Sequence, residues 1–122
     1  LNVQGGAGDD DITITGCTFT GSPEIRIFGD AGGFEAFYSA AGNDTIRVRN
    51  CILDAQDPDG VGVFASVLIG GDVVNEPGTF VGGNDVIEVT DFTATLTSTA
   101  DFSDLFFDVF GESVESGATL VG

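Results

Sequence analysis

The fold of this chain is decided by a nine-residue stretch, Gly5-Gly6-Ala7-Gly8-Asp9-Asp10-Asp11-Ile12-Thr13. The stretch returns in shortened form as Ala41-Gly42-Asn43-Asp44-Thr45-Ile46 and as Gly82-Gly83-Asn84-Asp85-Val86-Ile87. The equivalent positions of the copies, such as Asp10, Asp44 and Asp85, are 34 and then 41 residues apart. Self-similarity at such a period indicates a repeat architecture. We therefore divide the 122 residues into repeats at approximately 1–41, 42–82 and 83–122, which form either a single unit or a fragment of a longer repeat array.

Each of these turns is followed by a run in which apolar and polar residues alternate, as is typical of a β-strand. Stacking the runs in register predicts two inward-facing ladders, which are Ile12, Ile46 and Ile87, and then Ile14, Val48 and Val89. No stretch shows the helical apolar period of about 3.6 residues. The sequence therefore predicts an all-β chain.

Repeats of this length with several short strands fit either the coils of a parallel β-solenoid or the blades of a β-propeller. Blades are antiparallel and typically contain Asn-Gly or Asp-Gly hairpins. The one such pair, Asp59-Gly60, falls in a segment whose length varies between repeats. We therefore predict a parallel β-solenoid (β-helix) of about three stacked coils of 34–41 residues.

A second glycine corner follows a later strand of each repeat. Its glycines are Gly29, Gly70 and Gly111, and the acids after them are Asp30, Asp72 and Glu112. Asp30 and Glu112 directly follow their glycines, whereas Asp72 comes one residue later after Gly70. The residues before these glycines, Phe28, Ile69 and Phe110, are predicted to form a ladder beside the corner. The three acids are interpreted either as a second metal-binding column or as a solvated acidic edge.

The composition limits the partners of the chain. Three arginines and no lysine stand against 20 acidic residues, so the formal net charge is −17. Without a basic patch to neutralise phosphates, binding to nucleic acid or to an anionic membrane surface is not expected. No run approaches the roughly 20 apolar residues of a membrane span, so membrane insertion is not expected either. An acidic, glycine-rich chain can be disordered, but 42% patterned hydrophobic residues favour a folded core.

The pattern Gly-Gly-x-Gly-x-Asp-x-apolar-x in residues 5–13 resembles the nonapeptide of the repeats-in-toxin (RTX) family of secreted calcium-binding proteins. The turns at Gly42 and Gly83 match only its core, Gly-Asn-Asp-x-Ile. In that family the nonapeptides follow one another directly in a β-roll, whereas this chain has one turn in each long coil. Because the resemblance covers the turns, it implies that the chain binds calcium and is secreted. It does not imply that the chain folds as a simple β-roll.

The residue types in the turns suit calcium. Glycine and asparagine tolerate left-handed backbone and let carbonyl oxygens converge, and Ca²⁺ takes six to eight oxygen ligands. Stacked carboxylates without a cation repel one another, although Gly-Asn-Asp can also form a turn without metal. We expect a column with Ca²⁺ between neighbouring coils, built from Asp10, Asp44 and Asp85 with Gly6, Gly8, Gly42, Gly83, Asn43 and Asn84. The second candidate column is Asp30, Asp72 and Glu112.

Cys17 and Cys51 fall at the same place in neighbouring repeats. Neighbouring strands bring Cα atoms within the range of about 4.4–6.8 Å that a disulfide needs. The pair is interpreted either as a disulfide or as two small buried side chains.

No catalytic residue is identified. A Ser-His-Asp triad is impossible without histidine, and no pair of acids stands apart from the turns, so we do not expect an enzyme. The expected function is that of an extracellular, calcium-stabilised structural or adhesive repeat protein that associates end to end, as a filament, a surface layer or an adhesin stalk at the cell surface. The alternative is an accessory calcium-binding module of a larger secreted enzyme or toxin.

Overall fold

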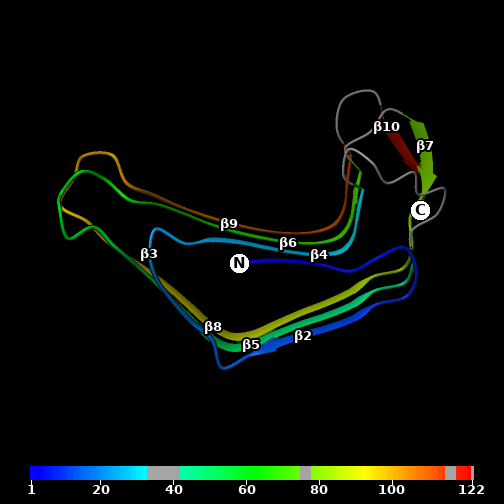
Figure 1. The fold of residues 1–122 in the computed structure, drawn as a ribbon, viewed down its shortest axis with the longest axis horizontal. Coiled ribbons are helices and arrows are strands. Elements are labelled where there is room, and N and C mark those ends of the chain that lie inside the picture. Colours follow the sequence, from blue (N-terminus) through cyan, green and yellow to red (C-terminus); the bar gives the residue numbers. More distant parts are fainter. Residues whose placement is uncertain (33–41, 75–77, 115–117, 122) are drawn as a thin grey trace.

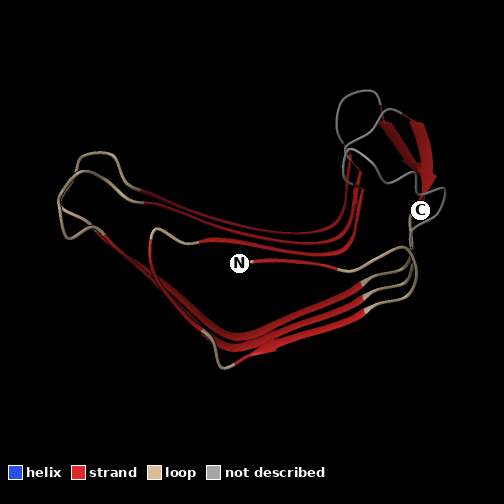
Figure 2. Ribbon diagram, in the orientation of Figure 1, coloured by secondary structure: helices blue, strands red, loops and turns tan. Residues whose placement is uncertain are grey.

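The computed structural model describes residues 1–32, 42–74, 78–114 and 118–121. This part of the chain is built of β-strands joined by turns (Figure 2), and it contains no helix. It therefore offers no apolar helix long enough to cross a bilayer. The strands are β1 (Asn2–Gln4), β2 (Asp11–Thr15), β3 (Thr18–Gly21), β4 (Glu24–Gly32), β5 (Thr45–Gln56), β6 (Phe64–Val74), β7 (Gly78–Val81), β8 (Val86–Thr97), β9 (Asp104–Val114) and β10 (Ala118–Val121).

Every described strand pairs in parallel, and apart from the pair β1–β4 the partners come from neighbouring repeats. One sheet has the order β1-β4-β6-β9, and in a second sheet β5 pairs on one side with β2 and β3 and on the other with β8. Strands β7 and β10 form a third, two-stranded sheet. Figure 1 shows β4, β6 and β9 following one path, and β2, β5 and β8 following another. The all-β prediction with parallel strands is therefore confirmed.

The pairing register confirms both predicted ladders. Ile12, Ile46 and Ile87 lie opposite one another across β2, β5 and β8, and two residues later so do Ile14, Val48 and Val89. The alternation of side chains along each strand points these residues to one side, where Ile46 and Val48 join a buried cluster with Leu53, Val67 and Ile69. The hydrophobic core thus lies between the two four-stranded sheets.

Burial falls off from the middle repeat to the last one. Ile46 and Ile69, on β5 and β6, are 0% exposed because each strand has a paired neighbour on both sides. Val109 stands opposite Ile69 on β9 and is 42% exposed. In the described chain β9 has a paired neighbour on one side only, so the side chains that continue the core there remain open to solvent.

The register of the second corner differs from the prediction. Phe28, Gly70 and Phe110 lie opposite one another, and so do Asp30, Asp72 and Glu112. The corner glycine of the middle repeat is therefore Gly71 and not Gly70, and the prediction that Asp72 falls one residue late is wrong.

The predicted ladder of Phe28, Ile69 and Phe110 is also wrong, because Ile69 lies opposite Ile27 and Val109. The physical reason is that Gly70 leaves room above its backbone. The rings of Phe28 and Phe110 approach there, with centroids 6.3 Å apart. A Cβ atom on Gly70 would overlap the Phe110 ring.

The opening stretch of the sequence spans both corners. Strand β1 pairs with β4, and the Gly5 N–H donates to the Phe28 carbonyl at 3.0 Å. Gly5 and Gly6 therefore continue the register of Gly29 and Asp30 at the second corner, whereas Asp10 lies opposite Asp44 at the first. The match to the nonapeptide pattern thus covers two structural corners joined through Ala7 and not a single turn.

Candidate metal centre

The first corner stacks its aspartates as predicted. The Asp10 N–H donates to Asp44 Oδ1 at 2.9 Å, and the Asp44 N–H donates to Asp85 Oδ1 at 3.0 Å. Asp44 and Asp85 therefore each use one carboxylate oxygen to hold the backbone of the preceding repeat. The column of Asp10, Asp44 and Asp85 is confirmed as a structural feature.

The asparagines beside this column form a separate ladder. The Asn84 N–H donates to Asn43 Oδ1 at 3.0 Å, and the Asn43 N–H donates to Asp9 Oδ1 at 2.8 Å. Hydrogen bonds from Asn43 hold the pKa of Asp9 below its usual value. Because Asn43 Oδ1 accepts the backbone N–H of Asn84 on the exposed surface, the structure gives the Asn43 side chain a structural role in the turn. That Asn43 and Asn84 are metal ligands stays a prediction.

The turn glycines allow a very close approach of neighbouring backbones. A Cβ atom on Gly42 would overlap the Gly8 carbonyl, and one on Gly83 would overlap the Gly42 carbonyl. The Gly6 N–H instead donates to Asp10 Oδ2 at 2.9 Å. These four glycines therefore shape the corner, and their backbone makes room for the carboxylates.

The second corner supports the first. Asp30 Oδ2 accepts the N–H of Gly42 at 2.6 Å, and Asp72 Oδ2 accepts the N–H of Gly83 at 2.9 Å. Each second-corner aspartate thus holds the first turn of the following repeat. The sequence predicts two separate columns of acidic residues, one at each corner. These hydrogen bonds connect the two columns.

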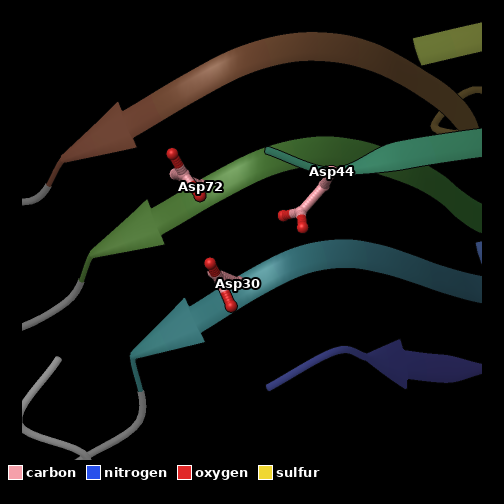
Figure 3. A group of neighbouring side chains, drawn as sticks. All are labelled: Asp30, Asp44 and Asp72. Atoms are coloured by element: carbon pink, nitrogen blue, oxygen red, sulfur yellow. The ribbon is translucent and has the colours of Figure 1, made fainter. Parts of the chain in front are cut away.

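The result is a cluster of three buried carboxylates. Asp30 lies on β4, Asp72 on β6 and Asp44 just before β5, and they are 3%, 0% and 1% exposed. One oxygen of each lies within 4.8 Å of the other two. Figure 3 shows Asp44 with its carboxylate directed towards Asp30 and Asp72. The predicted ligands Asp44, Asp30 and Asp72 are therefore brought together, from two neighbouring repeats.

Part of this oxygen surface is unsatisfied. Asp30 Oδ1 and Asp44 Oδ2 are buried and have no hydrogen-bond partner among the described residues, and the same holds for Asp85 Oδ2 one repeat further on. Burial raises the pKa of Asp44 to about 6 and is aided by the charges of Asp30, Asp85 and Asp72, against the lowering effect of the Asp10 N–H. Burial also raises the pKa of Asp30. Buried carboxylates without a counter-charge are costly, so a bound cation would stabilise this cluster.

The donor set fits calcium. Two oxygens bound to one Ca²⁺ at about 2.3–2.6 Å can be at most about 5 Å apart, and the three carboxylate oxygens meet this limit. A set made only of carboxylate oxygens favours a hard cation, whereas structural zinc sites use cysteine and histidine. Asp30, Asp44 and Asp72 would hold the ion.

The other acidic residues predicted as ligands are Asp10, Asp85 and Glu112, and they are not members of the cluster of three. The charges of Asp10 and Asp85 act on Asp30 across the corner. The backbone of Glu112 is in register with Asp72, but the side chain of Glu112 lies outside the described part of the structure. Sequence reasoning missed the pairing of the two corners. Its one signal was the similar spacing between the two corners, which is 12 residues from Asp30 to Gly42 and 11 residues from Asp72 to Gly83.

The two cysteines are free thiols. Cys51 is buried and half-buried Cys17 stands beside it, since Thr18 and Ile52 are paired. The Cys17 Sγ donates to the Thr15 carbonyl at 3.7 Å, and the Cys51 Sγ donates to the Arg49 carbonyl at 3.3 Å. Burial and the neighbouring Cys51 raise the pKa of Cys17. The disulfide between them stays a prediction.

No family model matches this chain, and searches of the curated proteins and of the solved structures found no match either. The resemblance to RTX repeats therefore stays a prediction, and the chemistry of the cluster has to be argued from its own geometry.

The stability of the calcium-free protein is expected to increase as the pH is lowered from 7 to about 4.5. Burial raises the pKa of Asp44 from its ordinary 3.8 to about 6 in the folded state. The folded state therefore binds more protons in this window, and the free energy of unfolding decreases as the pH rises. Asp9 and Asp57, whose pKa values are lowered, act in the opposite direction mainly below about pH 4. Urea unfolding in metal-free buffer measures the effect, and a free energy that rises steadily from pH 4.5 to 7 would contradict it.

Proposed function

We propose that this chain is an extracellular, calcium-stabilised parallel β-solenoid that serves as a structural or adhesive element and associates end to end. The observation that supports calcium most directly is the buried cluster of Asp30, Asp44 and Asp72. Within it, Asp30 Oδ1 and Asp44 Oδ2 have no hydrogen-bond partner among the described residues. The cluster draws its members from two repeats, so a cation bound there would link one repeat to the next.

The coupling between folding and calcium follows from the charges. The chain carries a formal net charge of −17, and three of its carboxylates are forced together only when the corners fold. Calcium supplies the positive charge and the oxygen coordination that this arrangement lacks. A ligand that binds only the folded state stabilises it in proportion to the logarithm of its concentration. A calcium-rich space outside the cell would therefore favour the folded chain.

The solenoid is supported by the pairing pattern. Strands β4, β6 and β9 pair in register with one another, and the strands of the second sheet do the same. The last repeat leaves Phe107 and Val109 partly exposed at positions where the middle repeat buries Val67 and Ile69. Open strand edges with such side chains favour the stacking of further repeats or of another copy.

Removal of calcium is expected to lower the melting temperature by about 10 °C, on the basis that calcium at about 100 times its Kd stabilises the folded state by about 2.7 kcal/mol. Far-UV circular dichroism during heating, in about 1 mM calcium and in excess chelator, measures the difference. Addition of magnesium in place of calcium is the control for ionic strength. A melting curve that is the same in chelator and in calcium would contradict the proposed metal site.

Association is tested separately. Light scattering and electron microscopy over a range of protein concentrations in calcium would detect end-to-end assembly. Elongated assemblies that dissolve in chelator support the filament or surface-layer form of the proposal. Particles that stay monomeric at all concentrations, with calcium binding intact, favour the accessory module of a larger secreted protein.

A further inference from the structure

The outer face of the sheet β4-β6-β9 carries a hollow of about 410 Å³. Glu24, Ser66 and Phe106 lie opposite one another across this sheet, and Phe64 lies opposite Asp104. The hollow forms because the small Ser66 stands between the larger side chains. It shares no residue with the aspartate cluster, whose Asp30 and Asp72 lie six residues further along β4 and β6 than Glu24 and Ser66.

Two exposed aromatic rings border the hollow. Phe64 on β6 is 64% exposed and Phe106 on β9 is 54% exposed. Ala65 and Val67, also on β6, point into the core and are 3% and 0% exposed. The rings therefore contribute little to the core, and a ligand in the hollow would cover apolar surface that now faces water.

The charged groups of the hollow are acidic. Glu24 and Asp104 line it, and none of its lining residues is basic. Arg26 forms an ion pair with Glu24, so the carboxylate of Asp104 remains to attract a ligand. The surrounding protein carries a formal net charge of −17, which raises the local concentration of cations and repels anions.

We propose that this hollow binds a lysine or arginine side chain from a partner protein. The alkyl part of such a side chain would lie against Phe64 and Phe106, because long basic side chains cover apolar surface with their stems. The charged head would face the rings and the carboxylate of Asp104, a combination that attracts cations through both the ring quadrupole and the opposite charge. A neutral sugar would use the rings alone and leave the acidic charge unmatched.

The test uses the full chain in calcium at about 150 mM salt, where long-range attraction is screened beyond about 8 Å. Tetralysine is titrated into isotope-labelled protein, with fully acetylated tetralysine as the uncharged probe. We expect amide chemical shifts to change around Phe64, Ser66 and Phe106. The double variant Phe64→Ala, Phe106→Ala is expected to weaken tetralysine binding roughly 5- to 30-fold, given about 0.5–1 kcal/mol for each exposed cation–ring contact.

Phe102→Ala is the matched control, because Phe102 is 63% exposed and does not line the hollow. This variant should bind tetralysine within about twofold of the parent. Asp104→Asn provides a second readout that leaves both rings in place, and it should weaken binding and reduce its salt dependence. Shifts spread evenly over the acidic surface, equal binding by the double variant, or tighter binding of a neutral trisaccharide at the hollow would each overturn the proposal.

Discussion

The variant Asp44→Asn is expected to be more stable than the parent protein in the absence of calcium and less stable in its presence. Asparagine keeps Oδ1, which accepts the Asp10 N–H at 2.9 Å. It replaces the buried Oδ2, which has no partner among the described residues, with an amide that can donate to the carboxylates of Asp30 or Asp72. Without metal, the change thus removes a buried charge from a cluster of like charges.

The expected size follows from the same charges. Since the pKa of Asp44 is raised from 3.8 to about 6, removal of its charge should stabilise the metal-free protein by on the order of 1–2 kcal/mol at neutral pH. With calcium, the loss of one carboxylate ligand should reverse the order. If the affinity falls about a hundredfold, a stabilisation of about 2.7 kcal/mol drops to below about 0.5 kcal/mol.

Urea unfolding of both proteins, with and without calcium, gives the four free energies that this comparison needs. Asp108→Asn is the matched control, because Asp108 is an exposed aspartate on β9, in the sheet that also carries Asp30 and Asp72. It should change stability by less than about 0.5 kcal/mol in either condition. If Asp44→Asn proves destabilising in both conditions by the same amount, Asp44 acts through its turn hydrogen bonds alone.

The variant Gly29→Ala is expected to lose most of the calcium-dependent stabilisation and to unfold more easily in every condition. A Cβ atom on Gly29 would overlap the carboxylate of Asp44, including its Oδ2, Cγ and Cβ atoms. Asp44 is 1% exposed, so it has no free space into which to move. The added methyl group therefore has to displace a carboxylate from the cluster, and overpacking of this kind typically costs about 1–3 kcal/mol, occasionally more.

The chain provides its own control at an equivalent position. Gly111 continues the register of Gly29 and Gly71, because Phe28, Gly70 and Phe110 lie opposite one another. A Cβ atom on Gly111 would have no described atom within 4 Å. Gly111→Ala should therefore keep its calcium response and its stability within about 1 kcal/mol of the parent. Thermal melts of both variants in calcium and in chelator decide the matter, and equal losses in the two variants would show that the corner rejects alanine for backbone reasons.

The strands were predictable because their signal is local. The alternation in residues 45–49 marks which side chains point inwards, and the recurrence of Ile12, Ile46 and Ile87 sets the register between repeats. Both features were confirmed. The first-corner column of aspartates followed from the same recurrence, because equivalent residues of in-register parallel strands have to stack.

The second corner could not be aligned from glycine positions alone. Gly70 and Gly71 are adjacent in the sequence, and both are followed within two residues by Asp72. The choice between them depends on the rings of Phe28 and Phe110, which meet over Gly70. A contact between the first and third repeats thus decides the register of the second.

The residue pattern of this chain therefore determines that it is all-β, that its strands repeat, and that acidic turns recur at fixed positions along it. Only the tertiary structure brings the aspartates of different turns into one cluster. Asp30 and Asp44 are separated by a connection of the chain, and Asp72 follows Asp44 by 28 residues. They come within 4.8 Å because the two sheets converge at one end of the repeat. The distance between sheets depends on how the core side chains pack, and no local pattern in the sequence records it.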